Sequence, residues 1–216
     1  MDTTIELENL EALEEGIHNL LDHLSNVQRF GVPAIVAINQ FPSDTIAEIE
    51  RVKQVALDAG ALGAEVADVY GRGGEGAEAL ARLVMNAPVE PLEPVRLYAD
   101  DDSIPAKIGK VASAMYGVDE VDFAQPALDA LARYDRAGYG NLPICMAKSQ
   151  YSFSGNAGET GKRGAGKITV RELLLSAGSG YIVPVCGAIN LMPGLGKNPG
   201  AAGFELLPDG TIVGVV

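Results

Sequence analysis

The amino-acid sequence predicts an α/β fold, and three observations lead to this conclusion. Residues 32–38 form an uncharged run rich in β-branched side chains, which stops at polar and turn-forming residues as a buried strand does before a loop. The order of strand, loop and amphipathic helix then occurs twice in succession. Three prolines within residues 88–94 mark a change of unit, because proline interrupts both helices and central strands. We therefore expect the end of a parallel-sheet domain over residues 1–90 and a smaller α/β domain over residues 91–216.

The first half of the chain is predicted to alternate between helices and strands. Apolar residues recur at intervals of three and four, first before and then after the strand predicted over residues 32–38. Thr45 and Glu48 have the spacing of a capping box, which predicts the start of a helix that ends at Gly60. The expected elements are helices over 9–28, 46–60 and 77–85 and strands over 32–38 and 64–70.

The second half shows the same signals with shorter elements. Two helical patterns end near Gly117 and Gly138, as expected of glycine after a helix. Two apolar runs with several β-branched residues are separated by the small-residue turn 176–180, which predicts a pair of strands. The expected strands lie over 95–99, 143–147, 167–175 and 181–186.

Composition and charge narrow the class of protein. The chain has 216 residues, of which 47% are hydrophobic, and this is ample for a core. No apolar run approaches the roughly 20 residues that span a bilayer, and the acidic N-terminus is unlike a signal peptide, so we expect a cytoplasmic protein. A net charge of −13 argues against nucleic acid and acidic membranes as partners.

The two cysteines are predicted to be buried, reduced thiols. Cys145 and Cys186 each lie inside an apolar run, without a CxxC pattern or a nearby Cys or His partner. We therefore expect neither a disulfide nor a metal site.

Candidate ligand-binding residues follow the expected strands. In open α/β sheets ligands bind beyond the carboxyl ends of the strands, and Phe41, Pro42 and Tyr70 lie at such ends. The alternative is that Phe41 and Tyr70 are core aromatics of two neighbouring strands. Lys148 and Gln150 follow residues 143–147 in the same way, and their donors suit either a binding loop or an ordinary surface loop.

A glycine-rich turn over residues 71–76 lies between the second strand and its helix. Glycine lets the backbone approach a ligand closely, and a helix N-terminus favours anions, so Gly73 and Gly74 are candidate contacts. The same glycines would also suit a plain tight turn.

Two nucleotide-binding motifs are incomplete. Gly161, Gly166 and Lys167 meet the glycine and lysine spacing of Walker A, but Ile168 occupies the position of the magnesium-binding hydroxyl. After the first strand, Gln40 and Pro42 replace the Lys and Asp of the guanine-reading N-K-x-D motif. We therefore assign no phosphate loop and no base-recognition motif to this chain.

Several segments resemble the formate-tetrahydrofolate ligase family, which makes 10-formyltetrahydrofolate from formate, tetrahydrofolate and ATP. VPAIVAINQFPSDT (32–45) resembles the family's VAIN-[RK]-FP-[TS]-DT, and EVADVYGRGGEG (65–76) resembles EVWAKGGEGG. AGYGNLPICMAKSQYSFS (137–154) is similar to LGYGDLPVCMAKTQYSFS, and LMPGLGK (191–197) is similar to MTMPGLPK with glycine in place of proline. The resemblance covers nearly all of this chain but less than half of the family's length.

The resemblance implies a two-step reaction, in which ATP phosphorylates formate and the folate amine then attacks formyl phosphate. It identifies Phe41, Pro42 and Tyr70 as the residues that would pack the pterin, with Tyr70 offering a smaller π surface than the family's Trp. The further anion or loop contacts would be Gly73, Gly74, Lys148, Gln150 and Lys197.

This part of the ligase would contain the end of a P-loop-like domain, with no catalytic and no metal-binding residue. The complete enzyme would use ATP with Mg²⁺ and tetrahydrofolate, and its ligands can also include a monovalent cation. Its partners would be formate, tetrahydrofolate and an N-terminal P-loop portion in cis or in trans, in a homo-oligomer. The alternative is a non-catalytic folate-binding or assembly subunit of a split ligase.

Overall fold

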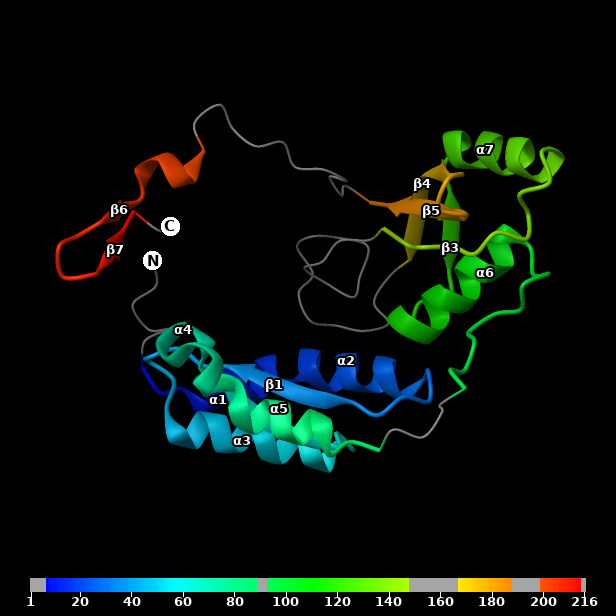
Figure 1. Cartoon of the computed structure of the whole chain (residues 1–216). Helices are drawn as coiled ribbons and strands as arrows, with labels where there is room; N and C mark the ends of the chain where they lie inside the picture. Colours follow the sequence, from blue (N-terminus) through cyan, green and yellow to red (C-terminus); the bar gives the residue numbers. More distant parts are fainter. Residues whose placement is uncertain (1–6, 89–92, 148–166, 188–198, 215–216) are drawn as a thin grey trace.

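The computed structural model describes residues 7–88, 93–147, 167–187 and 199–214, and it shows a mixed α/β protein (Figure 1). The strands in these ranges form three small sheets. One is a parallel pair, one is a mixed sheet of three strands, and one is a C-terminal hairpin. The expected mixture of helices with parallel strands is therefore confirmed.

The first part of the chain is built around the parallel strands β1 and β2. Their register is uniform, running from the pair Ile35 and Gly63 to the pair Asn39 and Ala67. The helices α2 and α3 pack against one face through a small core that includes Leu24 and Ala56. The elements are α1 (Leu10–Gly16), α2 (His18–Gln28), β1 (Ile35–Asn39), α3 (Ile46–Asp58), β2 (Gly63–Ala67), α4 (Val69–Arg72), a 3-10 helix (Gly73–Ala77) and α5 (Glu78–Met85).

The boundaries of these elements follow local chemistry. The capping box is confirmed, because the Thr45 hydroxyl accepts from the Glu48 N–H while the Glu48 carboxylate accepts from the Thr45 N–H. The single helix predicted over 9–28 is divided at Ile17, directly after Gly16, a residue with poor helix propensity. β1 begins later than predicted because Pro33 has no N–H to donate.

The second part of the chain contains the three-stranded sheet, in the order β3-β4-β5. β3 is parallel to β4, and the two strands expected on either side of the turn at 176–180 are β4 and β5, which pair antiparallel. Gly117 and Gly138 end the two predicted helical stretches in the left-handed region, with φ of 70° and 81°. The elements are α6 (Ile104–Val111), a π-helical turn (Ala112–Tyr116), β3 (Val121–Phe123), α7 (Gln125–Arg136), β4 (Ile168–Ser176), β5 (Tyr181–Cys186), a 3-10 helix (Gly200–Gly203), β6 (Glu205–Leu206) and β7 (Ile212–Val213).

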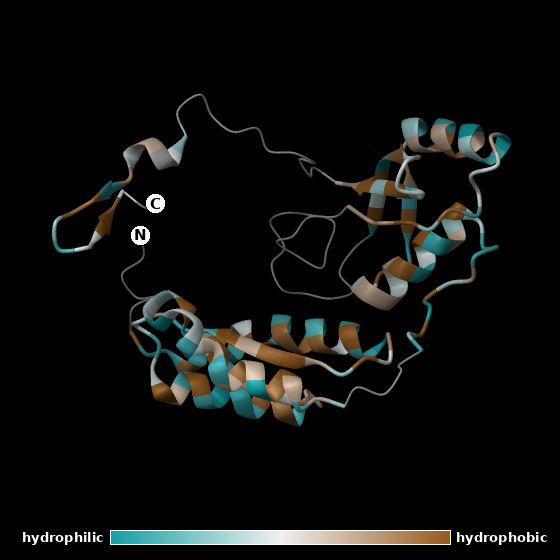
Figure 2. Cartoon of the chain, viewed as in Figure 1, coloured by the Kyte–Doolittle hydropathy of each residue, from teal (hydrophilic) through white to brown (hydrophobic). Residues whose placement is uncertain are grey.

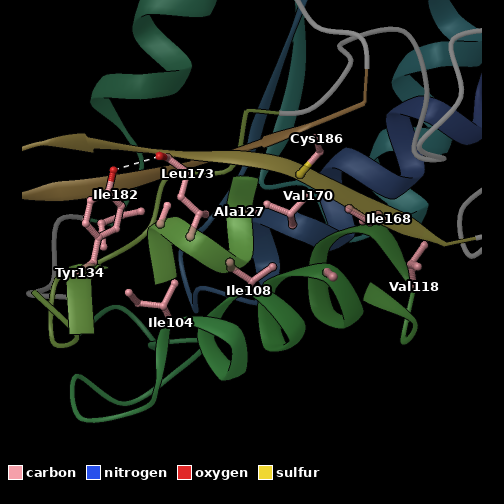
Figure 3. Close-up of a cluster of buried hydrophobic side chains, with 12 residues drawn as sticks. Ile104, Ile108, Val118, Ala127, Tyr134, Ile168, Val170, Leu173, Ile182 and Cys186 are labelled. Carbon is pink, nitrogen blue, oxygen red and sulfur yellow. Dashed lines mark hydrogen bonds between the residues drawn. The ribbon is translucent and has the colours of Figure 1, made fainter. Parts of the chain in front are cut away.

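The main hydrophobic core lies between this sheet and the helices α6 and α7 (Figure 3). Ile108, Ile168 and Ile182 are completely buried within it. The Tyr134 hydroxyl enters this core and donates to the Leu173 carbonyl at 3.0 Å. β3 pairs with β4 only as far as Val170, so Tyr134 satisfies a carbonyl that β3 does not reach.

A buried lysine organises the turn that follows α7. Lys107 is completely buried, and its ammonium donates to the Gly140 and Leu142 carbonyls at 3.2 and 3.1 Å. The ammonium also lies 5.8 Å from the centre of the Tyr98 ring, whose hydroxyl accepts from the Ile144 N–H. These contacts fix the turn because a buried cation requires its hydrogen bonds.

The predicted strand over 143–147 pairs with β5 only through two isolated parallel bridges, at Ile144 and Ala147. Between these bridges Pro184 lacks the N–H that would continue the ladder. The segment is only partly buried, and Cys145 is exposed, so the prediction of two buried thiols is wrong for Cys145 and correct for Cys186.

The prediction of a strand over residues 95–99 is also wrong. These residues have no regular secondary structure in the described part of the chain. The Val95 N–H donates to the Phe30 carbonyl, which ties this segment to the end of α2 without forming a ladder.

We expect Tyr134→Phe to lower the free energy of unfolding by about 1 to 2 kcal/mol, because the buried Leu173 carbonyl would lose its donor. Urea unfolding followed by circular dichroism would measure the change. Tyr139→Phe is the matched control, since the Tyr139 hydroxyl makes no hydrogen bond within the described residues and lies at the surface. Equal stabilities of the two variants would contradict the role of the Tyr134 hydroxyl.

Candidate functional site

Two loops meet at the carboxyl edge of the parallel pair. β1 ends at Asn39 and β2 ends at Ala67, and these two residues are partners in the register. The Gln40 N–H also reaches toward the Ala67 carbonyl at 3.5 Å, so the pairing extends into the first loop. The loops over 40–45 and 68–77 therefore leave the sheet side by side.

The first loop is held by Asp44. The Phe41 N–H donates to the Asp44 carboxylate at 2.8 Å, and the Asp44 N–H donates back to the Phe41 carbonyl at 3.0 Å. The loop then passes directly into the capping box of α3. Phe41 remains 59% exposed and Pro42 is also exposed, so both side chains face solvent at the edge of the sheet.

The capping carboxylate also joins this loop to the N-terminus of α1. Glu48 accepts from the Asn9 N–H at 2.9 Å and from the Thr45 N–H at 3.0 Å. These two backbone donors hold the pKa of the Glu48 carboxyl below its usual range. The Glu48 carboxyl is therefore ionised at neutral pH.

The second loop is held by Asp68, which sequence reasoning missed. Its carboxylate caps α4 by accepting from the Gly71 N–H at 3.0 Å, and its N–H donates to the Gly76 carbonyl at 3.1 Å. The available signal was an Asp at the end of an apolar run, where it suits a helix N-cap. Tyr70 consequently lies in α4, and the prediction that it ends a strand is wrong.

Neither aromatic residue belongs to the core. Tyr70 is 93% exposed, and Phe41 is more than half exposed. The alternative that these two are core aromatics of neighbouring strands is therefore excluded. Two exposed aromatic faces on adjacent loops are available to a planar ligand, because aromatic rings prefer stacked or edge-to-face partners.

The glycines of the second loop have separate roles. Gly76 is packed against the backbone, since a Cβ at this position would lie 1.9 Å from the Asp68 carbonyl oxygen. Gly73 has a φ of 57°, which favours glycine, whereas Gly74 faces open space. The tight turn is therefore observed, and contact of Gly73 and Gly74 with an anion stays a prediction.

A polar cavity of about 390 Å³ lies where the two loops meet. Arg72 borders it and forms an ion pair with Glu75 at 2.9 Å. Carboxylates outnumber guanidinium groups in the lining, which makes this cavity better suited to hydrogen-bond donors than to a phosphate. The charged and polar lining residues are Gln40, Glu65, Asp68, Arg72, Glu75, Glu78 and Arg82.

A larger, apolar cavity of about 690 Å³ lies elsewhere, beside residues 94–98. Its lining includes Phe30, Met115 and Tyr116, and burial raises the pKa of the Tyr116 hydroxyl. No sequence motif predicted this cavity, since its lining residues come from segments far apart in the sequence. The two loops are the candidate functional site, because their aromatic residues are exposed and follow the carboxyl ends of parallel strands.

Other candidate residues lie outside the described part of the chain. These are Lys148, Gln150 and Lys197, together with most of the segment with partial Walker A spacing. In the ranges that are described, no group of three or more His, Cys, Asp or Glu residues could hold a metal ion. None of the helices described is long and apolar enough to cross a membrane.

The fold and these loops define an α/β protein with a candidate ligand site at the carboxyl edge of a parallel sheet. The sequence model of the family described as formate-tetrahydrofolate ligase matches residues 1–216. The chain therefore belongs to the formate-tetrahydrofolate ligase family.

Two similar proteins bear the name formate-tetrahydrofolate ligase. The one from Symbiobacterium thermophilum is 44% identical over 209 residues, which cover 96% of this chain and 37% of that protein. The one from Methylobacterium nodulans is 41% identical over 211 residues, which cover 96% of this chain and 38% of that protein. The chain thus spans less than two fifths of the length of these relatives.

We expect Gly76→Ala to destabilise the second loop, because the added methyl group would collide with the Asp68 carbonyl. Overpacking of this kind costs about 1 to 3 kcal/mol. Gly74→Ala is the matched control in the same turn, since a Cβ there meets no atom within 4 Å, and its effect should stay within about 0.5 kcal/mol. Chemical denaturation of both variants would test this, and an unchanged midpoint for Gly76→Ala would contradict the close approach.

Proposed function

We propose that this chain is the C-terminal portion of an ATP-dependent formate-tetrahydrofolate ligase and that it supplies the folate site. The observation that carries this proposal is the pair of exposed aromatic residues, Phe41 and Tyr70, on adjacent loops at one edge of the sheet. Membership of the ligase family supports the identity of the ligand.

The pterin ring of tetrahydrofolate would stack between or beside these two aromatic side chains, with Pro42 contributing apolar contact. The pterin is planar and the loops are fixed by Asp44 and Asp68, so little order has to be gained on binding. Tyr70 has a smaller ring system than Trp and offers less stacking area. Gly73, Gly74, Lys148, Gln150 and Lys197 are proposed as further loop or anion contacts.

The complete ligase would phosphorylate formate with ATP and then transfer the formyl group from formyl phosphate to the folate amine. In this scheme the chain binds and orients the folate and contributes no phosphate-transfer residue. ATP and Mg²⁺ would be held by an N-terminal P-loop portion, in cis or in trans, since the Walker A spacing within this sequence lacks its hydroxyl residue. A monovalent cation is a further proposed ligand of the complete enzyme.

The proposed organisation places residues 1–90 at the end of a P-loop-like domain and residues 91–216 in a smaller α/β domain. We further propose that the complete enzyme is a cytoplasmic homo-oligomer. The second candidate is a non-catalytic folate-binding or assembly subunit of a split ligase, favoured by the incomplete Walker A spacing.

We expect Phe41→Ala and Tyr70→Ala each to weaken tetrahydrofolate binding by about 1 to 3 kcal/mol, the range for bases stacked on aromatic side chains. Isothermal titration calorimetry with reduced folate would measure the affinities. Phe204→Ala is the control, because Phe204 is a half-exposed aromatic residue near the C-terminal hairpin. The same affinity for all four proteins, with folding intact, would remove both residues from the proposed site.

A second experiment tests whether the phosphorylation of formate requires a P-loop portion outside this chain. We expect the pure chain to release no ADP from ATP and formate, since a complete Walker A motif is missing from its sequence. Mixing it with the part of the Symbiobacterium ligase outside the matched 209 residues should yield 10-formyltetrahydrofolate. Formate-dependent ADP release by the pure chain would contradict the proposal, and folate binding without product in the mixture would favour the non-catalytic subunit.

A further inference from the structure

Asp68 differs from the other carboxylates that line the polar cavity where the two loops meet. Of the four carboxylates in this lining, three form ion pairs with basic side chains. These pairs are Glu65 with Lys53, Glu75 with Arg72, and Glu78 with Arg82. Asp68 has no basic partner among the residues that the structure describes. It is therefore the lining carboxylate most available to a ligand.

The two carboxylate oxygens of Asp68 have different surroundings. Oδ1 accepts from the Gly71 N–H at 3.0 Å, and this hydrogen bond caps α4. No donor to Oδ2 is found within the described ranges of the chain. Asp68 is partly buried, and a carboxylate oxygen that is shielded from water favours a hydrogen-bond donor. One oxygen of this side chain thus holds the loop, and the other can accept from a ligand.

Gln40 brings an amide group to the same cavity from the first loop. It follows the last residue of β1, a strand that is hydrophobic along most of its length (Figure 2). The Gln40 N–H reaches toward the Ala67 carbonyl, which places Gln40 beside the residue that precedes Asp68. The Gln40 side chain is partly buried and makes no hydrogen bond to any other described residue. A carboxylate and an amide from adjacent loops therefore border one cavity.

Both polar side chains also lie next to the exposed aromatic residues. Gln40 directly precedes Phe41, and Asp68 lies two residues before Tyr70. A ring stacked on these aromatic side chains would therefore have its edge close to the polar cavity. Binding sites commonly combine apolar surfaces with a few polar groups that fix the orientation of the ligand.

We propose that Asp68 is a specificity-determining residue that recognises the 2-amino-4-oxopyrimidine edge of the pterin. This inference rests on the proposed function and deepens it. The edge presents two adjacent donors, the 2-amino group and N3–H, followed by the carbonyl acceptor O4. The Asp68 carboxylate accepts from the two donors, since Oδ1 keeps a second lone pair beside its bond to Gly71. The Gln40 amide donates to the carbonyl. The acceptors and the donor of the two loops thus match the edge in kind.

Stacking and edge recognition contribute to binding in different ways. An aromatic face tolerates many flat rings, as it tolerates every base of a nucleic acid. A site that forms hydrogen bonds to a polar group rejects an analogue that lacks this group, because the groups of the site are then left unpaired. Phe41 and Tyr70 therefore supply affinity, whereas Asp68 distinguishes a pterin from other flat rings.

The Asp68→Asn substitution separates the two roles of this side chain. It keeps an oxygen for the Gly71 N–H, since Asn caps a helix as well as Asp does. The second atom becomes an N–H donor, which opposes the donors of the pterin edge. Asp209→Asn is the matched control, because the Asp209 carboxylate also accepts from a backbone N–H, at 2.9 Å, and lies outside the cavity lining. Circular dichroism should show both variants folded, with melting temperatures close to that of the wild type.

The test compares tetrahydrofolate with 2-deamino-tetrahydrofolate, which lacks the amino donor, by isothermal titration calorimetry. The wild-type chain should bind the deamino ligand about tenfold more weakly, the usual effect of one hydrogen bond to a charged group. Asp68→Asn should weaken tetrahydrofolate binding by at least about tenfold. Its effect on the deamino ligand should be at least about threefold smaller, because that edge keeps only N3–H as a donor. Asp209→Asn should bind both ligands as the wild type does.

Two results would overturn the inference. Equal affinity of Asp68→Asn and the wild type for tetrahydrofolate would show that Asp68 does not contact the pterin edge. An equal loss for both ligands would show that Asp68 acts only through the shape of its loop. If tetrahydrofolate binding responds to Phe41→Ala and Tyr70→Ala but not to Asp68→Asn, the proposed function stands and only this inference fails. Absence of tetrahydrofolate binding by the wild-type chain would refute both.

Discussion

The parallel pairing of β1 with β2 is the constraint on which the candidate site depends. Phe41 and Tyr70 are 29 residues apart in the sequence, and each belongs to a loop without a hydrophobic core of its own. The loops become neighbours because the partners Asn39 and Ala67 end their strands at the same level. A shift of register by one residue would turn the strands' side chains to the opposite face and separate the loops.

The sequence predicted most of the elements whose signals are local. The capping box at Thr45, the left-handed glycines at 117 and 138, and the antiparallel strands around residues 176–180 each depend on a few adjacent residues, and all are observed. The place of Tyr70 in a helix was not predicted, because the Asp68 carboxylate competes with strand formation and turns the chain into α4.

Features that depend on distant neighbours were the least predictable. Cys145 lies in an apolar run that predicts a buried strand, yet it is exposed. Its segment lies at the edge of the sheet and pairs with β5 only through two isolated bridges. The interruption arises from Pro184 on another strand. Lys107 gave no sequence signal either, since its carbonyl partners lie more than 30 residues away, in the turn after α7. The role of Lys107 is therefore visible only once the fold is known.

The difference in exposure between the two cysteines has a practical consequence. Cys186 is buried, whereas Cys145 is exposed and lies three residues before Lys148. A maleimide fluorophore or spin label would therefore attach selectively at Cys145 in the unaltered sequence. Such a label would report, by spectroscopy and without engineered substitutions, whether folate or a partner polypeptide changes the surroundings of this strand.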